Sequence, residues 1–447
     1  MSLFDNRKNI WWIVYAILAI LLSAQSAREG GDFDVYLQGA EKMSRKANPY
    51  RIKSVPGDLE FYIIDDDGHR EWVEETRHYE LQYFYSPLFA MLLIPFVEFK
   101  FFIEFLWLLL SFALLIRIAN IIQYYFDPDM LTPRQGRLWV IAGIVLSARL
   151  IPYNITMIQI NIFIIWAAIE AMMLIRKKHS IIGGALLALA INIKLLPLVF
   201  VPYLAYRAKW KALAIILFCS VVYLFIPAAF MGWDYNRYLL YEWWFVINPL
   251  NAEHVIETDI NTHSLVAWIP NLLTETSGSM DLNRNIANLP VETSIAITNV
   301  FRVFLVGLFL WILRSVPFKP APSKMAEFRE ISYLLWVIPL IFPHQQKYAF
   351  ISMLPAIIYV IYGLIVMPVA NQKQKVILWL GVSFVLLIFT PLIGSDIIGR
   401  YTYNLLQYYK VLTISGLAIL PILLIFNPDK IELWRNNMSR DEQAHST

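Results

Sequence analysis

Long apolar runs recur along this chain and constrain its fold more than any other feature. Several of them are long enough to cross a hydrocarbon core about 30 Å thick, which requires roughly 20 helical residues. They contribute to a hydrophobic content of 58% over 447 residues, and they differ from the short alternating segments of a transmembrane barrel. The sequence therefore predicts an all-α polytopic membrane protein with about 10–12 transmembrane helices.

Composition excludes several other classes of protein. The single cysteine, Cys219, lies inside an apolar run, so neither a disulfide nor a cysteine-based metal site is available. The formal net charge is +3, and the charges are sorted by membrane side rather than gathered in a basic patch. We therefore expect no nucleic-acid partner.

The basic residues orient the predicted spans. Arg7 and Lys8 precede the first span, at 10–26, so the positive-inside rule places the N-terminus in the cytoplasm. The apolar but short segment 85–98 is interpreted as a re-entrant or juxtamembrane helix on the outer face. We predict the other spans at 101–123, 138–151, 157–174, 211–230, 295–314, 328–342, 348–367, 375–394 and 409–426.

This orientation gives one transmembrane domain over residues 1–427. Its two long outer loops are 27–84 and 231–294, and residues 428–447 form a polar cytoplasmic tail. We expect the protein in the inner (plasma) membrane, with its working face on the periplasmic or outer side.

The first outer loop opens with the run GDFDVYL at 31–37. Apolar residues recur on one helical face over 33–43, which predicts a helix lying at the membrane interface with Asp32 at its N-terminus. Further on, an acidic run at 65–68 partly resembles a calcium loop, but Ile63 occupies the first ligand position. We interpret that run as a solvated acidic turn and expect no metal site.

The segment 180–206 has basic clusters at both ends, at 176–178 and 207–211, so both ends are expected in the cytoplasm. Each arm is only about 14 residues long, too short for a comfortable crossing. This pattern predicts a hairpin or a pair of broken helices with Lys194 near the turn. A charge in lipid is expensive, so Lys194 must face a wet cavity.

Polar residues at the outer ends of these segments suit group transfer. A carboxylate that takes a proton, beside cations that hold a phosphate, fits movement of a group from a phosphorylated lipid to an acceptor hydroxyl. Plainer readings stay open: Asp32 could cap the interfacial helix, and Arg149 could contact lipid headgroups. The candidates are Asp32, Asp34, Tyr36, Tyr85, Arg149, Gln159, Asn161, Lys194 and His344.

Four motifs, taken in order, resemble glycosyltransferase family 87. They are GDFxVY at 31–36, YSP at 85–87, IQIN at 158–161 and LAxxIKxxP at 189–197. Over roughly residues 10–210 the chain is similar to C-type, polyprenol-phosphate-mannose-dependent mannosyltransferases of actinobacterial envelope synthesis. The resemblance implies a C-type glycosyltransferase fold within the membrane.

The resemblance also implies a reaction. A sugar, expected to be mannose, would pass by inverting displacement from a polyprenyl-phosphate donor to an envelope glycolipid or glycan acceptor, without a cofactor. Asp32 would be the general base, with Asp34 as its alternative, and His344 would assist catalysis. The remaining candidates would divide into donor-phosphate ligands, Lys194 and Arg149, and substrate ligands, Tyr36, Tyr85, Gln159 and Asn161.

Two other function classes fit the same features. A secondary transporter or lipid flippase also uses a broken helix with an intramembrane lysine, although 17 glycines in the chain are about half the usual share. An envelope glycan ligase with a pyrophosphate donor would use the same face. Substrate movement without Asp32 would indicate the transporter, and a strict need for pyrophosphate would indicate the ligase.

Overall fold

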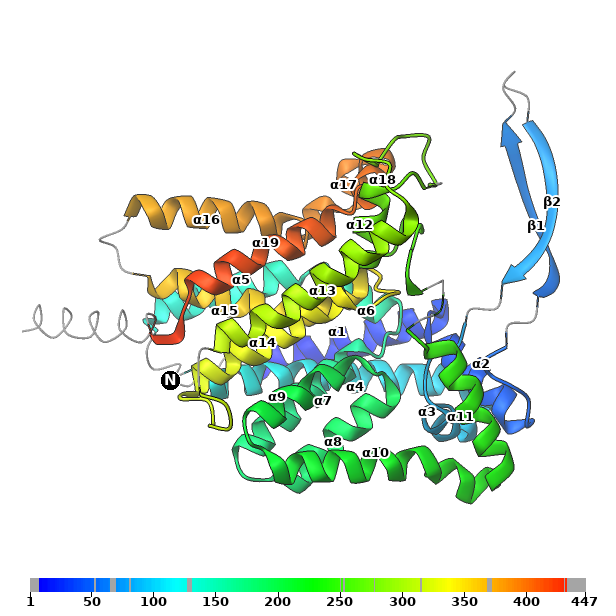
Figure 1. Cartoon of the computed structure of the whole chain (residues 1–447), viewed down its shortest axis with the longest axis horizontal. Helices are drawn as coiled ribbons and strands as arrows, with labels where there is room; N and C mark the ends of the chain where they lie inside the picture. The colour runs from blue at the N-terminus through cyan, green and yellow to red at the C-terminus, as the bar shows by residue number, and fades with distance from the viewer. Residues whose placement is uncertain are drawn as a thin grey trace, which may run out of the picture.

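The computed structural model describes residues 8–51, 54–64, 70–79, 82–126, 131–249, 251, 254–276, 278–313, 316–367, 372–429 and 431. In this part of the chain, helices run roughly side by side in a bundle, joined by short helices and loops at its ends (Figure 1). This confirms the prediction of an all-α polytopic fold for the body of the chain.

The helices account for each predicted span. In chain order they are α1 Lys8–Glu29, α2 Phe33–Ser44, α3 Pro87–Leu93, η1 Ile94–Phe99, α4 Lys100–Tyr125, α5 Pro133–Ser147, α6 Leu150–Thr156, α7 Asn161–Arg176, α8 Ser180–Ile193, η3 Leu196–Val199, α9 Phe200–Tyr206, α10 Trp210–Met231, α11 Trp233–Ile247, α12 Leu265–Leu273, α13 Val291–Leu313, α14 Lys324–Ile341, η5 Lys347–Met353, α15 Leu354–Val366, α16 Gln372–Leu387, η7 Pro391–Ile393, α17 Ser395–Ile398, α18 Arg400–Tyr408 and α19 Val411–Ile425.

Four helical stretches in the described part are long and apolar enough to cross a membrane on their own, and two bent pairs raise that number to six. The predicted total of 10–12 spans is larger because several helices that occupy predicted spans are short. For example, α7 has 16 residues and α19 has 15. The larger total stays a prediction.

Burial divides the bundle into a centre and a periphery. Every residue of α14 from Ala326 to Leu340 is buried, and so is nearly all of α15. On α10, α13 and α16, in contrast, Leu217, Val303 and Phe384 are each at least 70% exposed. Such large exposed apolar surfaces suit contact with lipid.

The interfacial helix predicted after Gly31 is α2. Its buried face includes the predicted apolar residues Phe33, Tyr36, Ala40 and Met43, which pack toward α3 and η1. The predicted short helix at 85–98 is also present, as α3 and η1, and it leads directly into α4.

One element of the first outer loop was not predicted. Strands β1 Ser54–Ile64 and β2 Arg70–Tyr79 form a two-stranded antiparallel hairpin, paired from Ser54 with Tyr79 to Ile64 with Arg70. The acidic composition of this stretch predicts a solvated loop, which is wrong for these two strands. The acidic turn predicted at 65–68 lies outside the described residues, as does the tail at 432–447.

The broken hairpin predicted at 180–206 is confirmed. Helix α8 ends at Lys194, whose backbone is extended at φ −143° and ψ 118°, and η3 and α9 form the returning arm. Pro197 explains the break, because it has no N–H to continue a helix past Ile193.

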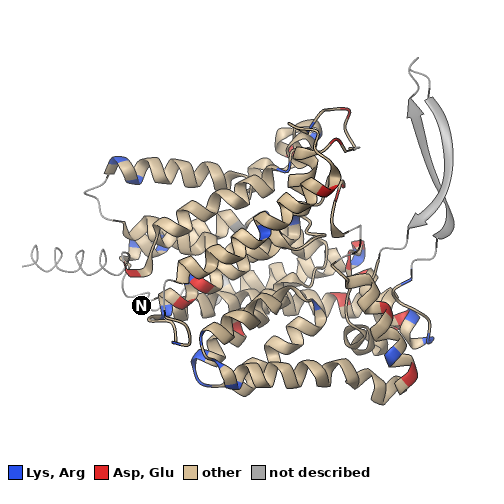
Figure 2. Cartoon of the chain, in the orientation of Figure 1, with Lys and Arg blue, Asp and Glu red and all other residues tan. Residues whose placement is uncertain are grey.

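Both feet of this hairpin meet the first turns of α14. Arg176 forms an ion pair with Glu327, and Arg207 forms one with Glu330. We call this group of four residues the Glu330 end. Figure 2 shows that charged residues gather toward the two ends of the bundle, with α2 and α3 at the end opposite the loop that precedes α14.

Candidate active site

Asp32 occupies the N-cap position of α2, but its side chain makes no capping hydrogen bond. Instead, its carboxylate accepts hydrogen bonds from Nε2 of Gln159 and from the hydroxyl of Tyr348. A capping role would require a bond to an N–H of the first helical turn. The structure therefore disfavours the plainer reading of Asp32 and turns its carboxylate toward other segments.

The backbone beside Asp32 is pressed against the junction of α6 and α7. The Asp32 N–H donates to the Met157 carbonyl at 3.0 Å, and a Cβ at Gly31 would lie only 2.8 Å from that carbonyl. The next residue, Ile158, has a φ of 47°, which is strained for a β-branched side chain. Strain of this kind costs about 1–3 kcal/mol and clusters at functional sites.

A chain of amides links this carboxylate to a cation. Lys194 Nζ donates to Oδ1 of Asn161 at 2.9 Å, and Asn161 Nδ2 donates to Oε1 of Gln159 at 3.4 Å. Because an ammonium only donates and a carboxylate only accepts, the two ends fix the orientation of both amides. We call Asp32, Gln159, Asn161, Lys194 and Tyr348 the Asp32 cluster.

The surroundings of Asp32 change its proton affinity. Burial raises the pKa of the Asp32 carboxyl above its ordinary value, and the Tyr348 bond, the Lys194 charge and the Gln159 bond offset this only in part. A raised pKa makes a carboxylate a stronger proton acceptor. Perturbation by burial together with named charged partners is typical of functional sites.

Two tyrosines flank the cluster, as the sequence predicted. The hydroxyls of Tyr36 and Tyr85 lie 3.0 Å apart, with ring centroids 4.6 Å apart, and the Tyr85 ring is 5.9 Å from Lys194 Nζ. On the other side, Tyr348 stacks on Tyr153 at 6.1 Å. Aromatic rings with polar tips can pack against sugar rings and hydrogen-bond to their hydroxyls.

Asp34 and Arg149 have their partners elsewhere. Asp34 forms an ion pair with Lys100 at 2.5 Å, at the start of α4. Arg149 donates to the Ile388 carbonyl, and its guanidinium lies 5.6 Å from the centre of the Tyr403 ring. Lys347 packs on the same ring at 4.9 Å, so Arg149 is grouped with Lys347 rather than with Lys194.

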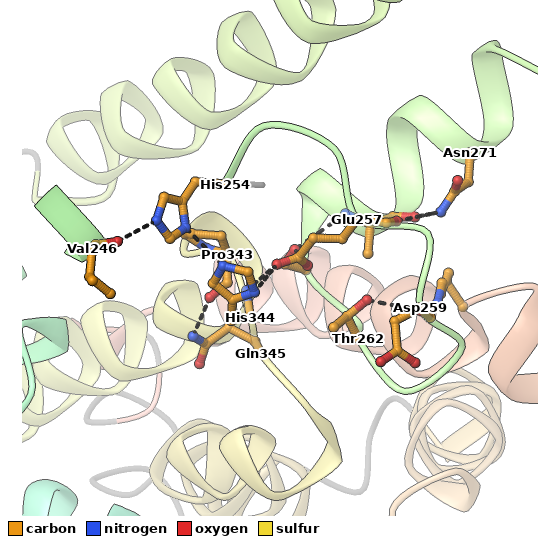
Figure 3. A network of polar contacts seen from close by, with 12 residues as sticks. Val246, His254, Glu257, Asp259, Thr262, Asn271, Pro343, His344 and Gln345 are labelled. Atoms are coloured by element: carbon orange, nitrogen blue, oxygen red, sulfur yellow. Dashed lines mark hydrogen bonds and ion pairs between the residues drawn. The ribbon is translucent and has the colours of Figure 1, made fainter. Parts of the chain in front are cut away.

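His344 lies in a separate polar network with His254 and Glu257 (Figure 3). Its Nδ1 is 3.0 Å from Glu257, and its Nε2 is 2.8 Å from His254. Its ring stacks on Phe84, at 5.3 Å and 29°, and Phe84 directly precedes Tyr85. Since protein atoms occupy both ring nitrogens, His344 has no free nitrogen for a ligand in this arrangement.

Sequence reasoning missed several residues of the site. Tyr348 contacts Asp32, and Asn154 donates to the Tyr348 carbonyl at 3.0 Å while accepting from Asn161 at 3.2 Å. The available signal was the polar run PHQQKY at 343–348 between two apolar spans. Only His344 of that run is among the predicted site residues.

A small pocket adjoins the cluster on the side of the bundle's centre. Asn161 contributes to its rim, and its walls are apolar residues of α7, η3 and α14, including Ile165, Leu196, Pro197 and Leu335. Among the described residues, no group of three or more His, Cys, Asp or Glu side chains is arranged to hold a metal ion.

Comparison with known protein families identifies the family of this chain. A sequence model of glycosyltransferase family 87 matches residues 83–326, which is more than half of the chain. The matched region contains Tyr85, Gln159, Asn161 and Lys194, whereas Asp32 and His344 lie outside it. The search of curated proteins gives no match, and neither does the search of solved structures. The match to the family model confirms the family that the motifs predicted. The bundle also has several helices long and apolar enough to cross a membrane. The chain therefore belongs to glycosyltransferase family 87 and is a multi-pass membrane glycosyltransferase.

Proposed function

We propose that this glycosyltransferase moves a sugar from a polyprenyl-phosphate donor to an acceptor hydroxyl, with Asp32 as the general base. One observation carries the proposal. The Asp32 carboxylate does not cap its helix but contacts Gln159 and Tyr348. The positive charge of Lys194 lowers the pKa of this carboxyl. A carboxylate of raised proton affinity beside a cation suits a displacement that releases a phosphate.

The chemical step balances as an inverting displacement. The acceptor oxygen attacks the anomeric carbon and forms the new glycosidic bond, while the bond from that carbon to the phosphate oxygen breaks. The acceptor proton passes to Asp32, and the electron pair leaves with the polyprenyl phosphate. Lys194 supplies positive charge to the leaving group, and Asp32 then releases its proton to water.

The surroundings of Asp32 suit such a donor. Tyr85 is half-buried and offers a ring and a hydroxyl to a sugar, and the buried Tyr36 supports it through the contact between their hydroxyls. Gln159 and Asn161 place amide groups next to Asp32. The apolar residues Leu196 and Pro197 line a small pocket beside Asn161, next to the position proposed for the phosphate. We expect mannose as the sugar and an envelope glycolipid or glycan as the acceptor, on the periplasmic side of the inner membrane.

Roles for the other predicted residues are narrower. Asp34 is held by Lys100, so Asp32 is the better placed of the two carboxylates. His344 has both ring nitrogens bonded to protein, so we assign it no direct contact with the leaving phosphate.

The experiment uses purified protein in bilayers with labelled polyprenyl-phosphate-mannose and a lipid extract as acceptor. Release of polyprenyl phosphate is compared for the wild type, Asp32→Asn and the matched control Asp34→Asn. We expect turnover in the wild type and in the control, and none in Asp32→Asn while donor binding is retained. Full activity of Asp32→Asn would refute Asp32 as the base.

The same assay separates the other function classes. Mannose-, glucose- and arabinose-bearing monophosphate donors are tested beside a pyrophosphate-linked glycan. Turnover of the pyrophosphate donor alone would replace the proposal with a ligase. Donor movement across the bilayer without sugar transfer would replace it with a flippase.

A further inference from the structure

Two histidines and one glutamate form a hydrogen-bonded row (Figure 3). His344 Nδ1 is 3.0 Å from Oε1 of Glu257, and His344 Nε2 is 2.8 Å from Nδ1 of His254. At the far end, His254 Nε2 is 2.8 Å from the Val246 carbonyl oxygen. We call His254, His344 and Glu257 the histidine clamp.

The partners at the two ends fix how many protons the clamp holds. The Val246 carbonyl can only accept, so His254 Nε2 carries a proton. Glu257 also accepts from the His344 backbone N–H and from the Ser264 hydroxyl, and several donors on one carboxylate favour its ionised form. His344 Nδ1 therefore carries a proton as well.

The contact between the two rings requires one more proton, because two facing lone pairs would repel. The pair of rings therefore holds three protons, whereas two neutral imidazoles hold two. The additional positive charge is shared by His254 and His344 and is balanced by Glu257. Sequence spacing does not reveal this arrangement, since His254 and His344 are 90 residues apart.

The clamp holds a strained turn. His344 has a φ of 56°, a left-handed backbone conformation that non-glycine residues adopt rarely. The turn is tied to the second long loop by a backbone bond from His263 to the Gln345 carbonyl, at 2.8 Å, and by a bridge between Thr262 and Gln346. Tyr348, four residues after His344, donates a hydrogen bond from its hydroxyl to the Asp32 carboxylate.

We propose that His254 and Glu257 are positioning residues that keep His344 protonated and so fix the turn that holds Tyr348 against Asp32. Gain of a proton would place two N–H groups face to face between the rings. Loss of a proton would leave a lone pair facing the Glu257 carboxylate. Either change loosens the turn and releases the Tyr348 hydroxyl.

Other charged groups act on the clamp from neighbouring elements. Arg302 of α13 and Lys410 at the junction of α18 and α19 both interact electrostatically with Glu257. Both are cations, so they favour an ionised Glu257, as the proton count requires. The effect of the clamp on catalysis rests on the proposed function, but its protonation state can be measured without any turnover.

The first test is the protonation state itself. Nitrogen-15 NMR of histidine-labelled protein in bilayers is practical because the chain has seven histidines, and the His254→Asn and His344→Asn variants assign the two rings. We expect three protonated nitrogens on the pair at neutral pH, and two in Glu257→Gln, where the balancing charge is gone. Two neutral rings in the wild type would overturn the proposal.

The second test uses two variants of one residue. In His254→Asn, the side-chain oxygen can take the place of Nδ1 and accept from His344; in His254→Gln, the amide can replace only the bond to Val246. We expect His254→Gln to move the acidic limb of the pH profile of kcat/KM to higher pH, and to lower kcat/KM about tenfold on that limb. We expect His254→Asn to retain most of the wild-type pH profile.

Equal losses in the two variants, or no shift in either, would reduce His254 to a packing role and overturn the proposal. Size-exclusion profiles and thermal unfolding check that both variants are folded. If the wild type turns over no donor, the proposed function fails, and the NMR measurement still decides the protonation state of the clamp.

Discussion

Charged side chains are paired differently at the Glu330 end and in the Asp32 cluster. At the Glu330 end, Arg207 and Glu330 are in direct contact, with side chains 2% and 6% exposed, and Tyr203 adds a hydrogen bond to the same carboxylate at 2.9 Å. At the other end, two amides separate Lys194 from Asp32. Opposite charges are thus joined directly at the Glu330 end, whereas Lys194 and Asp32 are held apart within the Asp32 cluster.

The difference indicates which end is prepared for a ligand. A buried ion pair in direct contact is complete, and breaking it leaves an uncompensated charge. Lys194 and Lys347, in contrast, have no carboxylate within ion-pair distance among the described side chains. Their positive charge is available to an anion such as a phosphate, whereas the charges of the Glu330 end are already used.

The largest expected effect comes from Asp32→Asn, which we expect to lower turnover about a thousandfold, because a general base contributes about 10²–10⁴-fold. The pKa of Asp32 is raised on folding, so the stability that this group contributes is present at acidic pH and is lost as pH rises through the folded pKa. At neutral pH the variant should therefore unfold at a temperature no lower than that of the wild type.

Turnover assays and thermal unfolding on the same preparation check this pair of effects. A variant that loses activity and also unfolds at a much lower temperature would show that Asp32 is structural, like the charges of the Glu330 end.

The next effect falls at the Glu330 end and concerns stability. Glu330→Gln should lower the free energy of unfolding by about 3–5 kcal/mol, because it leaves the buried Arg207 without its counter-charge. Turnover per folded molecule should stay close to that of the wild type. The double variant Arg207→Met with Glu330→Leu should recover most of the stability, and failure to recover would mean that the pair contributes more than compensation of charge.

A third prediction concerns the close approach of the first outer loop to the α6–α7 junction. Gly31→Ala places a methyl group 2.8 Å from the Met157 carbonyl, so Asp32 must move away from Gln159. We expect turnover to fall about tenfold, since small displacements of reacting groups are costly. Gly381→Ala, where a Cβ meets nothing within 4 Å, is the control, and equal turnover in the two variants would contradict the prediction.

The smallest effect is a shift in pH dependence. The Tyr348 hydroxyl lowers the pKa of Asp32, so Tyr348→Phe should raise that pKa and move the acidic limb of kcat/KM to higher pH. At the alkaline plateau, where Asp32 is ionised in both proteins, the variant should lose no more than about threefold. A uniform loss at every pH would indicate that Tyr348 binds substrate rather than tuning the base.

Prediction from the sequence succeeded where the information is local. The apolar runs located the helices, Pro197 and the flanking basic clusters located the broken hairpin, and the spacing of Gln159 and Asn161 placed both at the start of α7. Each of these depends on residues that are neighbours in the chain, so a pattern in the sequence can reveal it.

Other parts of the site depend on contacts between distant segments. Tyr348 meets Asp32, and His254 meets His344, only because the bundle brings their loops together. The β1–β2 hairpin was missed for a different reason: its many charged residues hid a strand pattern. A single sequence shows which residues are polar, but it does not show which of two distant loops will meet.

The ion pairs of Arg176 and Arg207 with α14 hold both ends of the 180–206 hairpin at one end of the bundle. This bears on how deep Lys194 lies in the membrane. Helix α8 has 14 residues, so at 1.5 Å per residue the Lys194 tip stands about 21 Å from the feet. If the ends of the hairpin lie at one surface of a hydrocarbon core about 30 Å thick and α8 runs perpendicular to that surface, the tip would lie about 9 Å beneath the opposite surface. Under the proposed function, the donor phosphate at Lys194 would therefore bind below the level of the lipid headgroups, and the sugar would be transferred at that depth.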